Sequence, residues 1–93
     1  MVDELKRLVT GVKGETSEIV TEDMTAIAVG SGTQREFATP ALAALMEKTA
    51  YKSVINYLDP DTCSVGSRTM LDHLAPTPVG SVVKCVTELV GIK

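Results

Sequence analysis

One long helical pattern in the middle of the sequence limits the possible folds more than any other feature. Thr39 is a good N-cap, and Pro40 suits the first helical position because its missing N–H would be unpaired there anyway. Asp59-Pro60-Asp61 is a typical helix end. Between these signals, from about residue 40 to 58, side chains recur at helical spacing and form an apolar stripe of Leu42, Leu45, Met46, Thr49, Ala50, Val54, Ile55 and Leu58.

The segments on either side of this helix are rich in β-forming residues. The pattern predicts a strand from about 16 to 22, a second extended piece near 25–29, and strands at 64–75 and 81–90. Residues 1–14 are more polar and fit either a short helical turn or a lead-in strand. The order strand, long helix, strand, strand predicts an α+β fold, because the last two strands are too close for a helical crossover.

The length and the composition set further bounds. A chain of 93 residues supports one domain, which we expect to span residues 1–93, and 44% hydrophobic residues are enough for it to fold. The net charge is −3 and no basic block is present, which argues against nucleic-acid binding. Residues 76–80 form a rigid connection that could be a hairpin or a crossing, so the strand order stays open.

Cysteine usage and the N-terminal sequence suggest a compartment. Cys63 and Cys85 have no CxxC spacing, and one histidine cannot complete a Cys/His set, so we expect no structural zinc. The charged N-terminus lacks the apolar core of a secretion signal. No apolar run approaches the roughly 20 residues that span a bilayer. The default expectation is a cytoplasmic protein that does not bind membranes.

Four residues could carry chemistry. Glu47 lies near the edge of the apolar face, where a carboxylate needs a partner or acts as an acid or base, although a solvated place beside Lys48 is the simpler interpretation. His73 is the only histidine and could move protons near neutral pH, but a lone strand histidine is more often structural. Thr39 could cap the helix and, at the positive end of the helix dipole, also serve as a nucleophile or a hydrogen-bond donor. Gly66 could let a ligand approach the backbone.

Taken together, these residues resemble the fluoroacetyl-CoA thioesterase family. The resemblance rests on Gly30-Ser31-Gly32, on Phe37 to Leu42, on Leu45-Met46-Glu47, on Val65 to Arg68 and on His73 to Gly80. It covers the chain from about residue 15 to the end. The family has the hot-dog fold, in which an antiparallel sheet wraps around one long helix, and its members are usually dimers.

The resemblance implies hydrolysis of a small acyl-CoA thioester without a metal or another cofactor. It assigns catalysis to Thr39, as nucleophile or polarising hydroxyl, to Glu47, which attacks or activates water, and to His73, the general acid/base. Gly66, Phe37 and Arg68 are the expected substrate-binding residues. The expected partners are an acyl-CoA and a second copy of the chain.

Three points stay open at this stage. Family members normally continue beyond the position of Lys93 with two further strands, so the resemblance implies a hot-dog domain truncated after its third strand. A sheet without those strands exposes unpaired edges, from which we expect closer dimerisation or pairing with another chain. The alternatives to an enzyme are a non-catalytic acyl-CoA or small-ligand binding module and a dimerisation module. The sequence does not define the acyl group.

Overall fold

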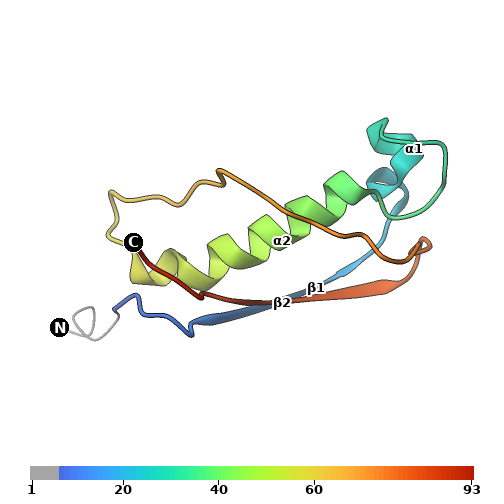
Figure 1. Cartoon of the computed structure of the whole chain (residues 1–93). Helices are drawn as coiled ribbons and strands as arrows, with labels where there is room; N and C mark the ends of the chain where they lie inside the picture. Colours follow the sequence, from blue (N-terminus) through green and yellow to red (C-terminus); the bar gives the residue numbers. More distant parts are fainter. Residues whose placement is uncertain (1–6) are drawn as a thin grey trace.

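A two-stranded antiparallel sheet and one long helix that lies across it form the body of the molecule (Figure 1). The computed structural model describes residues 7–93, so the expectation for the start of the chain falls partly outside the described residues. The strands are β1, Lys13–Ile19, and β2, Val82–Glu88. The second lies inside the predicted 81–90 segment, whereas β1 begins three residues before the predicted 16–22. The α+β class, with one long helix and a small antiparallel sheet of the hot-dog type, is confirmed.

The two strands pair along their whole length in a single register. Lys13 lies opposite Glu88 and Ile19 lies opposite Val82. Exposed and half-buried residues alternate strictly along both strands, because successive side chains point to opposite faces of a sheet. One face is therefore covered by the helix, and we call the opposite, exposed face the outer face.

The central helix, α2, covers Thr39–Val54 and continues as the 3-10 turn η3, Ile55–Tyr57, so its position agrees with the predicted 40–58. The predicted N-cap was wrong by one residue. The cap is Ala38, and Thr39 is already the first helical residue. Ala38 has an extended backbone and its carbonyl accepts the first helical bond from Leu42 N–H at 2.9 Å. Within residues 7–93 no helix is long and apolar enough to cross a membrane.

The extended piece predicted at 25–29 was also wrong. Residues 22–29 form the 3-10 turn η2, Glu22–Met24, and the one-turn helix α1, Ala26–Val29. The Thr25 hydroxyl explains the difference, because its oxygen accepts the Ala28 N–H at 3.2 Å and so caps the turn. Gly30, at a φ of 80°, ends α1 in the left-handed conformation that glycine adopts without strain.

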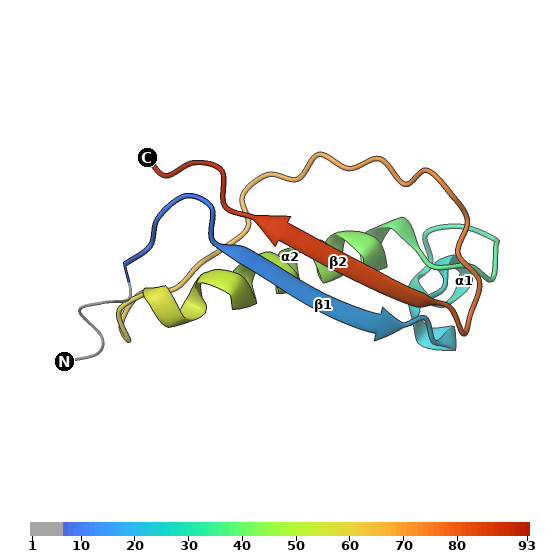
Figure 2. The ribbon, with the colours of Figure 1, turned by 90° about the horizontal axis from the view of Figure 1, so that it is seen from below.

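Residues 64–75, predicted as a strand, form no strand in the structure. The whole segment from 59 to 77 runs back past α2 without pairing in the sheet (Figures 1 and 2). The segment is fixed at its end, where Phe37 N–H donates to the Thr77 carbonyl at 2.8 Å and Glu36 forms an isolated bridge with Pro78. The strand was predicted from the alternating sequence alone, but a strand also requires a neighbouring strand to pair with.

A small core holds the helix against the sheet. Val20, Phe37 and Leu45 are almost fully buried and form its centre. Next to this core a polar contact joins the two layers. The hydroxyls of Thr16 on β1 and Thr49 on α2 are 2.5 Å apart, and Thr49, which is fully buried, also donates to the Leu45 carbonyl at 2.7 Å.

At Gly14 the helix and the sheet approach each other closely, and this generates our first prediction. A Cβ at Gly14 would lie 2.6 Å from the Ser53 Cβ and 3.0 Å from the Thr49 carbonyl oxygen. We expect Gly14→Ala to lower the free energy of unfolding by about 1–3 kcal/mol through overpacking, measured by urea denaturation. Gly91→Ala is the matched control, because its Cβ would meet nothing within 4 Å. Equal stability of the two variants would contradict this account of the helix–sheet contact.

Candidate active site

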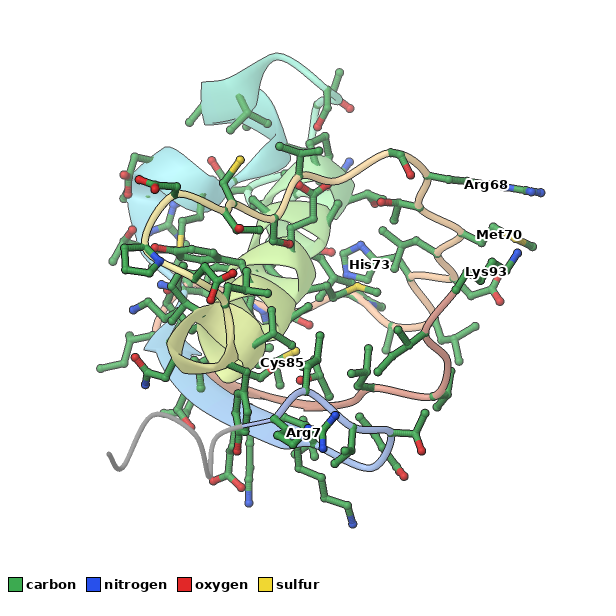
Figure 3. All side chains as sticks on the ribbon, turned by 90° about the vertical axis from the view of Figure 1, so that its left-hand side faces the viewer. Arg7, Arg68, Met70, His73, Cys85 and Lys93 are labelled. Atoms are coloured by element: carbon green, nitrogen blue, oxygen red, sulfur yellow. The ribbon has the colours of Figure 1, made fainter. Side chains whose placement is uncertain are left out.

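A hydrogen-bonded pair lies at the N-terminus of α2. The Thr39 Oγ1 is 2.8 Å from the His73 Nδ1. Thr39 is exposed in the first turn, while His73 is half-buried and comes from the returning 59–77 segment. In Figure 3 the His73 ring points toward α2. Residues far apart in the sequence thus bring a hydroxyl and an imidazole into direct contact, which is the arrangement of a nucleophile beside a base.

Phe37 holds the other side of the imidazole. Its ring meets the His73 ring edge to face, with centroids 6.3 Å apart and an interplanar angle of 79°. Phe37 is only 4% exposed and belongs to the core. The histidine is therefore oriented by a hydrogen bond at Nδ1 and by a rigid aromatic neighbour.

Glu47 and Gly66 form a second contact, in an open groove beside α2. A Cβ at Gly66 would lie 3.1 Å from the Glu47 Oε1, so the carboxylate lies directly against the glycine backbone. The groove has a volume of about 660 Å³ and is lined from α2 by Met46, Glu47 and Tyr51 among others, and from the returning segment by Val65, Gly66, Arg68 and Met70 among others. Figure 3 shows the Arg68 and Met70 side chains directed away from the helix.

The two contacts lie at different places along α2. Glu47 follows Thr39 by eight residues, which corresponds to about 12 Å along the helix axis. Thr39, His73 and Phe37 line a separate hollow of about 270 Å³ at the helix N-terminus. Within one chain, the structure brings Thr39 to His73 and Glu47 to Gly66, but it does not bring all of the predicted catalytic residues to one point.

The structure also separates the basic residues that could meet an anionic ligand. Arg35 is bound to the Glu22 carboxylate, with its Nε 2.9 Å from Oε1. Arg68 lines the groove and forms no ion pair within residues 7–93. Tyr51 and Lys48 were not singled out from the sequence, although both line the groove. The signal that could have identified Tyr51 was its position one turn after Glu47 on the same helix face.

Solved structures with the same fold come from the fluoroacetyl-CoA thioesterase FlK. One FlK structure has a TM-score of 0.86 at 24% identity and covers 92% of this chain and 68% of that one. A mutant in complex with fluoroacetate and CoA has a TM-score of 0.85 at 24% identity and covers 92% and 74%. A mutant in complex with fluoroacetate has a TM-score of 0.85 at 23% identity and covers 92% and 69%. The likeness defines the chain as a hot-dog-fold protein.

The family follows from the sequence itself. Residues 20–93 match the family model described as fluoroacetyl-CoA-specific thioesterase, FlK. The chain therefore belongs to this thioesterase family, as the resemblance had indicated. No curated protein matches the sequence individually.

The Thr39–His73 contact generates the second prediction. Thr39→Val keeps the shape of the side chain but removes the hydroxyl that meets Nδ1. We expect the ¹⁵N chemical shift of the His73 Nδ1 to change, because the tautomer balance of an imidazole depends on the partner of each ring nitrogen, as measured by long-range ¹H–¹⁵N NMR. Thr77→Val is the control, since its hydroxyl bonds only to the Ala75 carbonyl. Identical His73 spectra in the two variants would show that the hydrogen bond is absent in solution.

Proposed function

We propose that the chain hydrolyses a small acyl-CoA thioester to the free acid and CoA. The observation that carries this proposal is the 2.8 Å contact between the Thr39 hydroxyl and the His73 Nδ1. Membership of a thioesterase family supports the reaction type. A mutant of FlK, which has the same fold, has been solved in complex with fluoroacetate and CoA. That complex supports an acyl-CoA as the substrate class.

In this proposal Thr39 and His73 act as one unit. When Nδ1 is unprotonated, it accepts the hydroxyl proton while Oγ1 bonds to the acyl carbon. Collapse of the intermediate breaks the carbon–sulfur bond, and His73 returns the proton to the departing CoA thiolate. Water then hydrolyses the Thr39 ester with His73 again as base. Alternatively, the hydroxyl stays intact and donates to the thioester oxygen, at the N-terminus of α2 where developing negative charge is stabilised.

Glu47 is the proposed carboxylate that attacks the thioester or activates water. Its carboxylate lies against Gly66, where the absence of a side chain leaves space for a small acyl group. Arg68, on the rim of the same groove, is the proposed contact for a CoA phosphate, because a guanidinium matches phosphate oxygens in shape and charge. Phe37 takes part by orienting His73.

The separation of the two contacts favours a second candidate function. A single thioester carbonyl cannot touch both Thr39 and Glu47 while they are about 12 Å apart along the helix. If they stay apart, the chain binds acyl-CoA in the groove without turnover.

We propose further that the working form is a homodimer. The cytoplasm is the proposed compartment, in keeping with two cysteines that are both free thiols.

The third prediction separates catalysis from binding. We expect Glu47→Gln to lower kcat for short acyl-CoAs by about 10²–10⁴-fold, because an amide can neither attack nor accept a proton, with thiol release as the assay. Glu15→Gln is the matched control, since Glu15 lies on the outer face of β1. Calorimetric titration with CoA checks that binding persists. A folded wild-type chain that binds CoA but releases no thiol would overturn the hydrolase proposal and leave the binding module.

The fourth prediction concerns Arg68. We expect Arg68→Ala to raise the Kd for CoA by about 3–10-fold at low salt and to reduce its salt dependence, because a partly exposed charge contact is screened by ions. Arg35→Ala is the control, because Arg35 is held by Glu22. Dephospho-CoA should bind the wild-type chain and Arg68→Ala with more similar affinities if Arg68 meets the ribose phosphate. Equal Kd values for the two arginine variants would remove Arg68 from the site.

A further inference from the structure

The hollow that contains the Thr39–His73 pair has a wall from another part of the chain. This wall is the loop 30–36 between α1 and α2, which we call the wall loop, and it lies beside the N-terminal end of α2 (Figure 1). Three of its residues line the hollow, and all three have polar side chains: Ser31, Gln34 and Glu36. The hollow is thus polar on the side that faces the proposed nucleophile.

Backbone hydrogen bonds fix the wall loop on α1. Ala26 N–H donates to the Glu36 carbonyl at 2.9 Å, and Ile27 N–H donates to the Gln34 carbonyl at 3.2 Å. Ser31 N–H donates to the Ala26 carbonyl at 2.9 Å. Within residues 7–93, Ser31 and Gln34 use only backbone groups for their hydrogen bonds, and both residues are exposed. The Ser31 hydroxyl and the Gln34 amide are therefore left to water or to a ligand.

The charges around the hollow disfavour an anionic acyl group. Among the residues that line it, only His73 can carry a positive charge, and in the proposed reaction its imidazole begins neutral so that Nδ1 can accept a proton. Glu36 brings a negative charge, is half-buried and belongs to no ion pair within residues 7–93. The positive end of α2 serves the thioester oxygen. A carboxylate on the acyl chain would therefore meet a like charge without a counter-ion.

The size of the hollow suits a short ligand. Its volume is about 270 Å³, several times the roughly 30 Å³ that one water molecule occupies in the liquid. That is room for an acyl chain of a few carbons rather than for a long fatty chain. In the proposed reaction the Thr39 Oγ1 bonds to the acyl carbon, so the rest of the acyl chain extends from a residue that lines this hollow.

We propose that Gln34, together with Ser31, selects short acyl groups that carry a neutral hydrogen-bonding substituent, such as a hydroxyl. This inference rests on the proposed function, because it takes Thr39 as the residue that meets the acyl carbon. A side-chain amide both donates and accepts hydrogen bonds, so it matches a hydroxyl, which does the same. An apolar acyl group of equal length displaces water from the amide and returns no hydrogen bond.

The test, which is the fifth prediction, compares three thioesters whose acyl groups all have four carbons. They are β-hydroxybutyryl-CoA, butyryl-CoA and succinyl-CoA, which carry a neutral polar, an apolar and an anionic group. We expect the wild-type chain to favour β-hydroxybutyryl-CoA over butyryl-CoA by about 3–10-fold in kcat/KM, the effect of one net hydrogen bond. Succinyl-CoA should be the poorest substrate. Thiol release, corrected for the uncatalysed rate, gives the three values.

Variants of the wall loop assign the preference to its side chains. Gln34→Leu removes the amide but keeps a side chain of similar size, and we expect it to bring the ratio of hydroxybutyryl to butyryl turnover close to one. Ser31→Ala should lower the ratio in part. Glu36→Gln should raise kcat/KM for succinyl-CoA about threefold or more, because it removes the like charge. Asn56→Leu is the matched control, since it exchanges an exposed amide for an apolar side chain in η3, beyond the other end of α2, and should keep the wild-type ratio.

The outcomes separate this inference from the proposed function. Equal kcat/KM values for the hydroxybutyryl and butyryl thioesters, or a wild-type ratio in Gln34→Leu, would overturn the inference while the hydrolase proposal stands, and would place the acyl group beside Gly66 instead. If no thioester releases thiol, the hydrolase proposal fails, and the ratio of the Kd values from calorimetric titration with the same thioesters decides the inference. A folded chain that neither hydrolyses nor binds them overturns both. Circular dichroism melting shows that each variant is folded.

Discussion

The contact between α2 and β1 is the constraint on which the rest of the structure depends. Gly14 has no side chain, so Ser53 and the Thr49 carbonyl can lie where a Cβ would be. At that separation the hydroxyls of Thr16 and Thr49 meet at 2.5 Å, which satisfies polar groups that burial would otherwise penalise. The apolar residues Val20, Phe37 and Leu45 then close the core at the other end of the helix.

The site follows from this packing. Because one face of α2 is fixed on the sheet, Thr39 and Glu47 are displayed on turns that the sheet does not cover. The returning segment brings His73 to Thr39 and Gly66 to Glu47. The segment is held near its end by the bond from Phe37 to Thr77, and Phe37 also packs against the His73 ring. A core residue thereby links the position of the imidazole to the stability of the fold.

Local signals in the sequence predicted the helix well and its ends less well. The apolar stripe, Pro40 in the first turn and Pro60 beyond the end located α2, since these signals act through the helix backbone itself. The cap was predicted at Thr39 because a hydroxyl normally serves there, but that hydroxyl bonds to His73, a contact between residues 34 positions apart. The turn at 22–29 was misread because the capping role of Thr25 competes with its strand propensity.

The same limit explains why residues 64–75 were wrongly predicted as a strand. Alternating sequence encodes which face of a strand is apolar, but it does not encode which strand lies beside it. At 64–75 the alternation is present and the partner is not, and Val65, Met70 and Leu74 remain 81%, 79% and 90% exposed.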